Sequence, residues 1–180
     1  MEQQLKEPEQ QTRFEEVIMP HLDAAYNLAR WLTRNEHDAE DIVQDAFLRA
    51  FKFFESFRGG NSRSWLLSIV RNTAYTWLQK NRRHEVGTIP DEEIEKIHDE
   101  APNPEILAVK NTDHQEIMRA INELPVEFRE AIILRELEEM SYKEIADVLN
   151  VPLGTVMSRL ARARRQLQES LPHRQPGVSV

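Results

Sequence analysis

Apolar and polar positions along this chain form two periodic blocks separated by a stretch without periodicity. In residues 14–84 and 113–171 apolar side chains recur every three to four positions, which is the spacing of one face of an α-helix. Residues 85–112 contain three prolines and many acids, and polar tails precede and follow the two blocks (residues 1–13 and 172–180). We therefore predict an all-α protein of two small helical domains joined by a flexible acidic linker.

The first block contains a helix with a broad apolar stripe and an unusual opposite face in residues 38–54. The stripe consists of Ala39, Ile42, Val43, Ala46, Phe47, Ala50 and Phe54. The opposite face carries Asp41, Gln44 and Asp45 around Leu48. An acidic solvated face would explain the carboxylates, but a leucine among them resembles the apolar centre of a small protein-binding patch with a polar rim. This face is a candidate docking surface.

A basic and aromatic segment follows that helix. Residues 58–84 hold six lysines and arginines and no acid, and they begin with a Gly-Gly loop. Cations beside aromatic rings suit single-stranded or opened DNA, because the cations hold the backbone and the rings accept unstacked bases. Trp65 and Trp77 are explained more simply as core anchors, so the loop of residues 58–64 is the better candidate for contact.

The second block ends in a helix-turn-helix pattern in residues 140–167. Ser141 and Glu144 have the spacing of a capping box, and Asn150 suits the left-handed turn that follows. Pro152 then suits the first turn of a second helix, whose buried side is formed by Val156, Leu160, Ala163 and Leu167. Residues 153–168 contain four arginines and no acid. A plain αα-hairpin would not need them, so the pattern favours a helix that enters the major groove.

Composition excludes several classes of function. The net charge is −8, but residues 85–112 hold eight carboxylates against two lysines, which leaves two basic patches with an acidic segment between them. There are no cysteines, the six histidines have no metal-ligand spacing, and no phosphate-binding or nucleophile motif occurs. No apolar run is long enough for a membrane span. We predict a protein that is not an enzyme and needs no cofactor or metal.

Three stretches together resemble the bacterial sigma-70 family, and more narrowly its small extracytoplasmic-function (ECF) group. They are DAEDIVQDAFLRAF (residues 38–51), SWLLSIVRNTAYTWLQKNRR (64–83) and the segment of residues 121–167 that contains VPLGTVMSRL. The resemblance covers both periodic blocks. It implies a sigma region 2 domain in residues 14–84 and a sigma region 4 domain in residues 113–171.

The resemblance also implies a role for each surface. The family docks its acidic helix face on a coiled coil of core RNA polymerase, and the corresponding residues are Asp41, Gln44, Asp45 and Leu48. The positions that recognise and open the −10 promoter element are Arg58, Asn61, Arg63, Ser64, Arg71, Asn72 and Tyr75. The positions that read the −35 element are Thr155, Ser158, Arg159, Arg162 and Arg165.

The expected partners are RNA polymerase core, promoter DNA and an anti-sigma factor that covers one or both domains. The lack of an apolar run long enough for a membrane span and of a secretory signal predicts a cytoplasmic protein without membrane insertion, and we expect a monomer. The alternative is a stand-alone helix-turn-helix regulator whose first domain senses or dimerises. Such a regulator would not need an acidic helix centred on Leu48 followed by a basic, aromatic helix.

Overall fold

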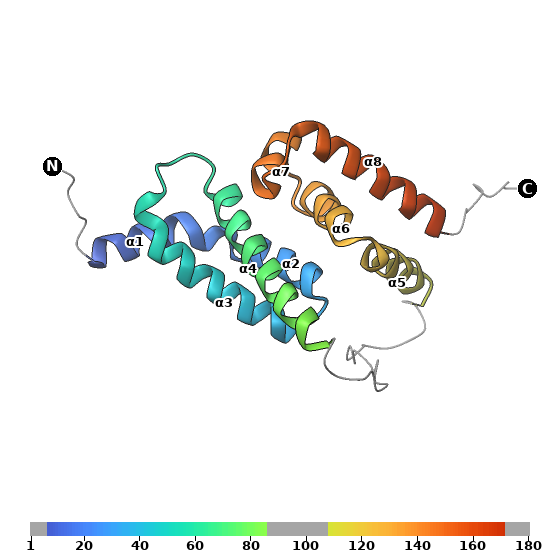
Figure 1. The fold of residues 1–180 in the computed structure, drawn as a ribbon, viewed down its shortest axis with the longest axis horizontal. Coiled ribbons are helices and arrows are strands. Elements are labelled where there is room, and N and C mark those ends of the chain that lie inside the picture. The colour runs from blue at the N-terminus through green and yellow to red at the C-terminus, as the bar shows by residue number, and fades with distance from the viewer. Residues whose placement is uncertain (1–6, 86–107, 172–180) are drawn as a thin grey trace, which may run out of the picture.

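The computed structural model describes residues 7–85 and 108–171, which form two groups of helices with no strand among them (Figure 1). The first group consists of α1 (Glu7–Ile18), η1 (Met19–His21), α2 (Leu22–Thr33), α3 (Glu36–Phe53), η2 (Phe54–Ser56) and α4 (Ser62–Glu85). The second group consists of α5 (Ala108–Glu123), α6 (Val126–Ile132), η3 (Ile133–Leu137), α7 (Tyr142–Leu149) and α8 (Leu153–Ser170). The prediction of an all-α fold with two helical domains is confirmed.

The element boundaries differ from the sequence-based ones at two places. Helix α1 begins at Glu7 and so includes residues 7–13 of the predicted polar tail. The buried ring of Phe14 explains this, because it packs edge-on against Phe51 and Phe54 at centroid distances of 5.2 and 5.3 Å. Helix α5 begins at Ala108, within the predicted linker. Most of that linker and the last nine residues lie outside the described residues.

The core of the first domain is the predicted apolar stripe of α3 packed against α2 and α4. Its side chains on α3 are buried, except that Phe47 is partly buried. Half of these six side chains are alanines, and short side chains let neighbouring helices approach closely. The buried residues of α2 that meet them are Ala24, Ala25, Leu28, Ala29 and Leu32.

The two domains pack against each other. Helix α4 lies against α7, and α2 lies against α6 (Figure 1). One continuous apolar core runs from Phe14 in α1 to Ala163 in α8, and it includes residues of both domains. The sequence did not predict this contact. Among the described residues, no helix is long and apolar enough to cross a membrane.

Candidate protein and nucleic-acid interfaces

The outer face of α3 is open in this structure. The helix is capped by Asn35, whose side chain accepts a hydrogen bond of 3.1 Å from the Asp38 N–H. Leu48 is 66% exposed, and its neighbours Asp41 and Gln44 are also exposed. Burying such a leucine against a partner removes apolar area from water, and the polar rim gives the contact its orientation. The structure therefore presents the predicted docking residues together on one free surface.

A shallow hollow lies beside this face, between α3 and α4. Its volume is about 220 Å³, and it is lined by Asp41, Ile42, Asp45, Arg49, Thr73, Thr76, Trp77 and Lys80. The half-buried carboxylate of Asp45 accepts a hydrogen bond of 3.0 Å from the Arg49 guanidinium, one turn further along α3. The pairing fixes one of the two carboxylates at the edge of the hollow.

The loop before α4 is shaped by two glycines. Gly59 and Gly60 have φ angles of 89° and 98°, in the region that favours glycine. Asn61 follows, and its side-chain oxygen accepts a hydrogen bond of 2.9 Å from the Ser64 N–H at the start of α4. Arg58 is exposed, whereas Ser64 is only 6% exposed. Of these predicted −10 residues, Arg58 is at the surface and Ser64 is not.

The aromatic residues at the start of α4 belong to the core. The Trp65 ring packs against Phe57 and Phe54 at centroid distances of 5.1 and 6.4 Å. Trp77 is partly buried and also packs on the core. The interpretation of both tryptophans as core anchors agrees with the structure.

Further along α4, Arg71 and Tyr75 form a half-buried pair. The Arg71 guanidinium lies 4.3 Å from the centroid of the Tyr75 ring, and burial raises the pKa of the Tyr75 hydroxyl. Burial alone would lower the pKa of Arg71, but its hydrogen bonds and its attraction to Glu130 raise that pKa above the ordinary value. Asn72, by contrast, is exposed.

The helix-turn-helix has the local geometry that the sequence predicts. Ser141 and Glu144 form a reciprocal capping box, and Asn150 is left-handed with φ 51° and ψ 51°. Helix α8 begins at Leu153, with Pro152 as its N-cap. It buries Val156, Leu160 and Ala163.

The polar face of α8 is only partly free. Ser158 and Arg162 are exposed, and Thr155 is half-buried. The exposed Arg165 donates a hydrogen bond of 3.0 Å to Glu169 on the same helix. Arg159 differs from them, because only 20% of its side chain is exposed.

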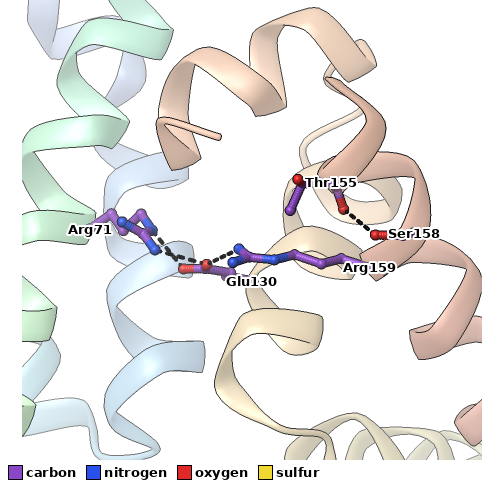
Figure 2. Close-up of polar contacts among 5 residues, drawn as sticks. All are labelled: Arg71, Glu130, Thr155, Ser158 and Arg159. Carbon is purple, nitrogen blue, oxygen red and sulfur yellow. Dashed lines mark hydrogen bonds and ion pairs between the residues drawn. The ribbon is translucent and has the colours of Figure 1, made fainter. Parts of the chain in front are cut away.

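Arg159 is held by Glu130, which is fully buried in α6 (Figure 2). The same carboxylate accepts hydrogen bonds of 2.7 and 3.0 Å from the Arg71 guanidinium of the other domain. Figure 2 shows the carboxylate between the two arginines. Arg71 and Arg159, which the sequence assigns to different promoter elements, therefore share one carboxylate.

Two further acids of the second domain contact predicted −10 residues. Glu138, which is 6% exposed, pairs with Arg63 and accepts a hydrogen bond of 3.3 Å from the Asn27 side chain. Glu144 accepts a hydrogen bond of 2.7 Å from the Asn61 side-chain amide. Sequence reasoning missed the contacts that Glu130, Glu138 and Glu144 make with the first domain, although it placed Glu144 in the capping box. One signal for Glu130 was available, because it stands directly before the apolar run of residues 131–134.

Arg129 also joins the domains, through backbone carbonyls. It is 4% exposed and donates hydrogen bonds of 2.9 Å to the carbonyl of Trp31 in α2 and 3.0 Å to that of Leu124. Burial lowers its pKa to about 10. In the described part of the chain no group of three or more potential ligands is arranged to hold a metal ion.

Comparison with known proteins identifies both domains. The family model for sigma-70 region 2 matches residues 17–84, and that for sigma-70, region 4 matches residues 114–167. The ECF RNA polymerase sigma-E factor of Escherichia coli is 38% identical over 141 residues, covering 74% of each chain. The ECF RNA polymerase sigma factor SigE of Mycolicibacterium smegmatis is 35% identical over 158 residues. This match covers 88% of the present chain and 61% of that relative's length.

Solved structures agree with this result. The sigma factor RpoE of Bartonella quintana, solved in complex with the anti-sigma factor NepR, has a TM-score of 0.71 and 30% identity. The match covers 88% of this chain and 96% of that one. CnrH, solved with the cytosolic domain of CnrY, has a TM-score of 0.62 at 23% identity and shares the fold. That match covers 88% of this chain and 87% of CnrH. Both conserved sigma regions are therefore present, in order, and the chain belongs to the ECF group of sigma-70 family RNA polymerase sigma factors.

Proposed function

We propose that this chain is an alternative sigma factor that directs RNA polymerase core to specific promoters and helps to open them. The observation that carries the proposal is the tandem of a region 2 domain with a free acidic face on α3 and a region 4 domain with a capped helix-turn-helix. Family members are initiation factors, which agrees with the prediction that the chain is not an enzyme. The stand-alone regulator gains no support, since it would not need region 2.

Each of the surfaces described above is proposed to contact a different partner. Core polymerase docks on the α3 face formed by Asp41, Gln44, Asp45 and Leu48. The −10 element meets the loop before α4 and the polar side of α4, through Arg58, Asn61, Arg63, Arg71, Asn72 and Tyr75. The buried Ser64 is left out of this set. The −35 element meets α8 through Thr155, Ser158, Arg159, Arg162 and Arg165.

The proposal includes the setting in which the chain works. It acts in the cytoplasm, as a monomer in its free form, and an anti-sigma protein restrains it, as the complex of the Bartonella quintana sigma factor RpoE with the anti-sigma factor NepR suggests. No cofactor is needed, since binding and DNA opening are performed by side chains that contact protein and nucleic acid.

Transcription with purified components tests the proposal. The chain is added to core RNA polymerase on a library of templates with randomised −35 and −10 positions, and the transcripts are sequenced. We expect transcripts only when the chain is present, with enriched bases at both positions. Transcripts that show no enrichment at either position would contradict promoter recognition.

A matched pair of charge reversals tests the docking face in the same assay. Asp45→Arg places a cation on the α3 face, and we expect it to lower affinity for core by tenfold or more. Glu123→Arg makes the same change on an exposed carboxylate of α5 and should leave core binding unaltered. Equal binding by the two variants would remove α3 from the proposed interface.

A further inference from the structure

Helix α8 has exposed apolar side chains that the proposed function does not use. Met157 is 52% exposed, and Ala161, one turn further along the helix, is exposed as well. Residues four positions apart lie on the same side of an α-helix, so these two side chains form one apolar strip. The strip does not belong to the core, because α8 meets the core through Val156, Leu160 and Ala163. It is therefore open to a partner.

A polar strip runs beside the apolar one. Ser158 and Arg162 each follow a member of the apolar strip by one residue, which places them about 100° further around the helix. Both are exposed, and both are proposed to contact the −35 element. The exposed side of α8 therefore has an apolar edge and a polar edge that run in parallel.

The charges around the apolar strip favour DNA as its partner. Arg164 and Arg165 follow Ala161 by three and four residues, so both lie at one end of the strip. Each pairs with a glutamate, yet 45% and 80% of their side chains stay exposed. An apolar protein segment would have to cover these cations, whereas DNA offers phosphates to the cations and apolar groups to the strip. The strip therefore matches the major groove.

Thymine is the base that offers an apolar group in the major groove. Its C5-methyl group projects there, whereas guanine offers two acceptors, and adenine and cytosine offer amino groups. Alanine is among the side chains that contact this methyl group, and methionine is flexible and polarizable enough to adapt to it. Arginine instead prefers the acceptors of guanine. The two edges of α8 therefore favour different bases.

We propose that Met157 and Ala161 select thymine in the −35 element, through contact of their side chains with its C5-methyl group. We call these two residues the methyl-contact strip. The thymine can lie on either DNA strand, since both strands present their bases in the same groove. This inference rests on the proposed function, because the contact forms only if α8 lies in the major groove of the −35 element.

Replacement of thymine by uracil tests the contact, since uracil lacks only the C5-methyl group. A template from the selection of −35 and −10 sequences is used, and each −35 thymine on either strand is replaced in turn. Transcription by core polymerase is measured at a limiting concentration of the chain. We expect about fourfold lower transcription at one or two positions, the effect of one buried methyl group. No loss at any thymine, or a selected −35 element without an A·T pair, would overturn the proposal.

Met157→Ala tests whether this side chain provides the contact. The variant removes one partner of the pair, so its thymine and uracil templates should differ by less than about twofold. Because the side chain is half exposed, its loss should leave the helix content measured by circular dichroism unchanged. Met19→Ala removes a methionine of similar exposure, 44%, from the first domain and should keep the full uracil effect. A full effect in both variants would overturn the assignment to Met157.

A second variant and a binding measurement separate DNA contact from protein contact. Ala161→Ser places a hydroxyl group on the methyl-contact strip and should also weaken the uracil effect. Core polymerase should bind both strip variants as it binds the wild type. If Met157→Ala loses affinity for core while the uracil effect stays unchanged, the strip contacts protein and the proposal is wrong.

Failure of this inference can be told apart from failure of the proposed function. Enriched −35 bases without any uracil effect would overturn the methyl contact alone. Transcription without enrichment at the −35 positions would overturn promoter recognition by α8, and the methyl contact with it.

Discussion

The α3 face and the polar side of α4 belong to one domain, yet they meet different surroundings. Leu48 on α3 is 66% exposed, whereas Arg71 on α4 has only 15% of its side chain exposed and binds a buried acid. The proposed polymerase surface is therefore ready for contact before the proposed DNA surface is. This difference makes the two faces a direct test of how contact between the domains affects each of them.

The largest expected effect comes from removing Arg71, which lies on the side of α4 that contacts the second domain. Arg71→Ala leaves Glu130 with Arg159 alone at 3.3 Å. A buried carboxylate that loses its main partner costs about 3–5 kcal/mol, and we expect the lower end because water reaches Glu130 when the domains part. Urea denaturation followed by circular dichroism measures the loss.

Arg49→Ala is the matched control on α3. The two side chains of its pair with Asp45 are about half exposed, at 48% and 49%, so loss of the pair should cost about 0.3–0.5 kcal/mol. Similar costs for the two variants would mean that Glu130 is not held by a buried network, and the contrast between the two faces would disappear.

Leu48→Ala tests the exposed face of α3 directly. We expect no change in the free energy of unfolding, since the side chain already lies in water, and a loss of about 1–3 kcal/mol in affinity for core polymerase. Fluorescence titration of labelled chain with core measures the affinity. Met19→Ala, 44% exposed and outside the α3 face, should bind core like the wild type.

Two arginines of α8 extend the comparison to the second domain. The exposed Arg162 faces the proposed −35 groove, whereas Arg164 donates a hydrogen bond of 2.9 Å to Glu136 at the side of the helix. Arg162→Ala should cost about 1–3 kcal/mol at one or two base pairs of the −35 element. Arg164→Ala should weaken transcription on all templates alike and reduce the salt dependence by about one unit of slope.

A panel of templates with single changes in the −35 element, transcribed at several salt concentrations, separates these outcomes. If the Arg162 variant loses activity uniformly across the panel, Arg162 does not read bases. Sequence alone leaves open whether Arg159 or Arg162 takes the base contact, and the engagement of Arg159 by Glu130 does not decide it.

The smallest expected effect is the pH response of Glu144, which accepts a hydrogen bond from Asn61 of the first domain. Hydrogen bonds from the Ser141 backbone and hydroxyl lower the pKa of Glu144, with a smaller contribution from Asn61. A carboxyl with a lowered folded-state pKa stabilises the fold above its ordinary pKa, and this contribution is lost as pH falls through the lowered value. Thermal melting between pH 6 and pH 3 should show a steeper loss in wild type than in Glu144→Gln. Parallel curves would show that the cap does not depend on the charge.

Local structure was predictable from the sequence because its causes are local. The buried stripe of α3, the Ser141–Glu144 capping box and the left-handed Asn150 each follow from residues within one or two turns of a helix. The second helix of the helix-turn-helix begins one residue after Pro152, where the sequence predicts its first turn.

The contact between the domains could not be predicted in this way. Arg71 and Glu130 are 59 positions apart, and no spacing rule joins an arginine on one helix to an acid on another. From sequence alone, an acid on a short amphipathic helix is expected to be solvated. Only the position of Glu130 directly before a run of four apolar residues indicates burial. The start of α1 at Glu7 was missed for a related reason, since the distant Phe51 and Phe54 anchor Phe14.

The π-helical turn η3 makes the contact between Glu138 and Arg63 depend on residue count rather than on residue identity. Its π-helical hydrogen bond runs from the Glu138 N–H to the Ile133 carbonyl at 3.1 Å, one residue further than in an α-helix. Deletion of the exposed Leu137 would let α-helical geometry continue and rotate the following side chain by about 100°. The carboxylate of Glu138 would then leave Arg63. A single-codon deletion, in a segment where substitutions of exposed residues change little, would thus be enough to break a contact between the two domains.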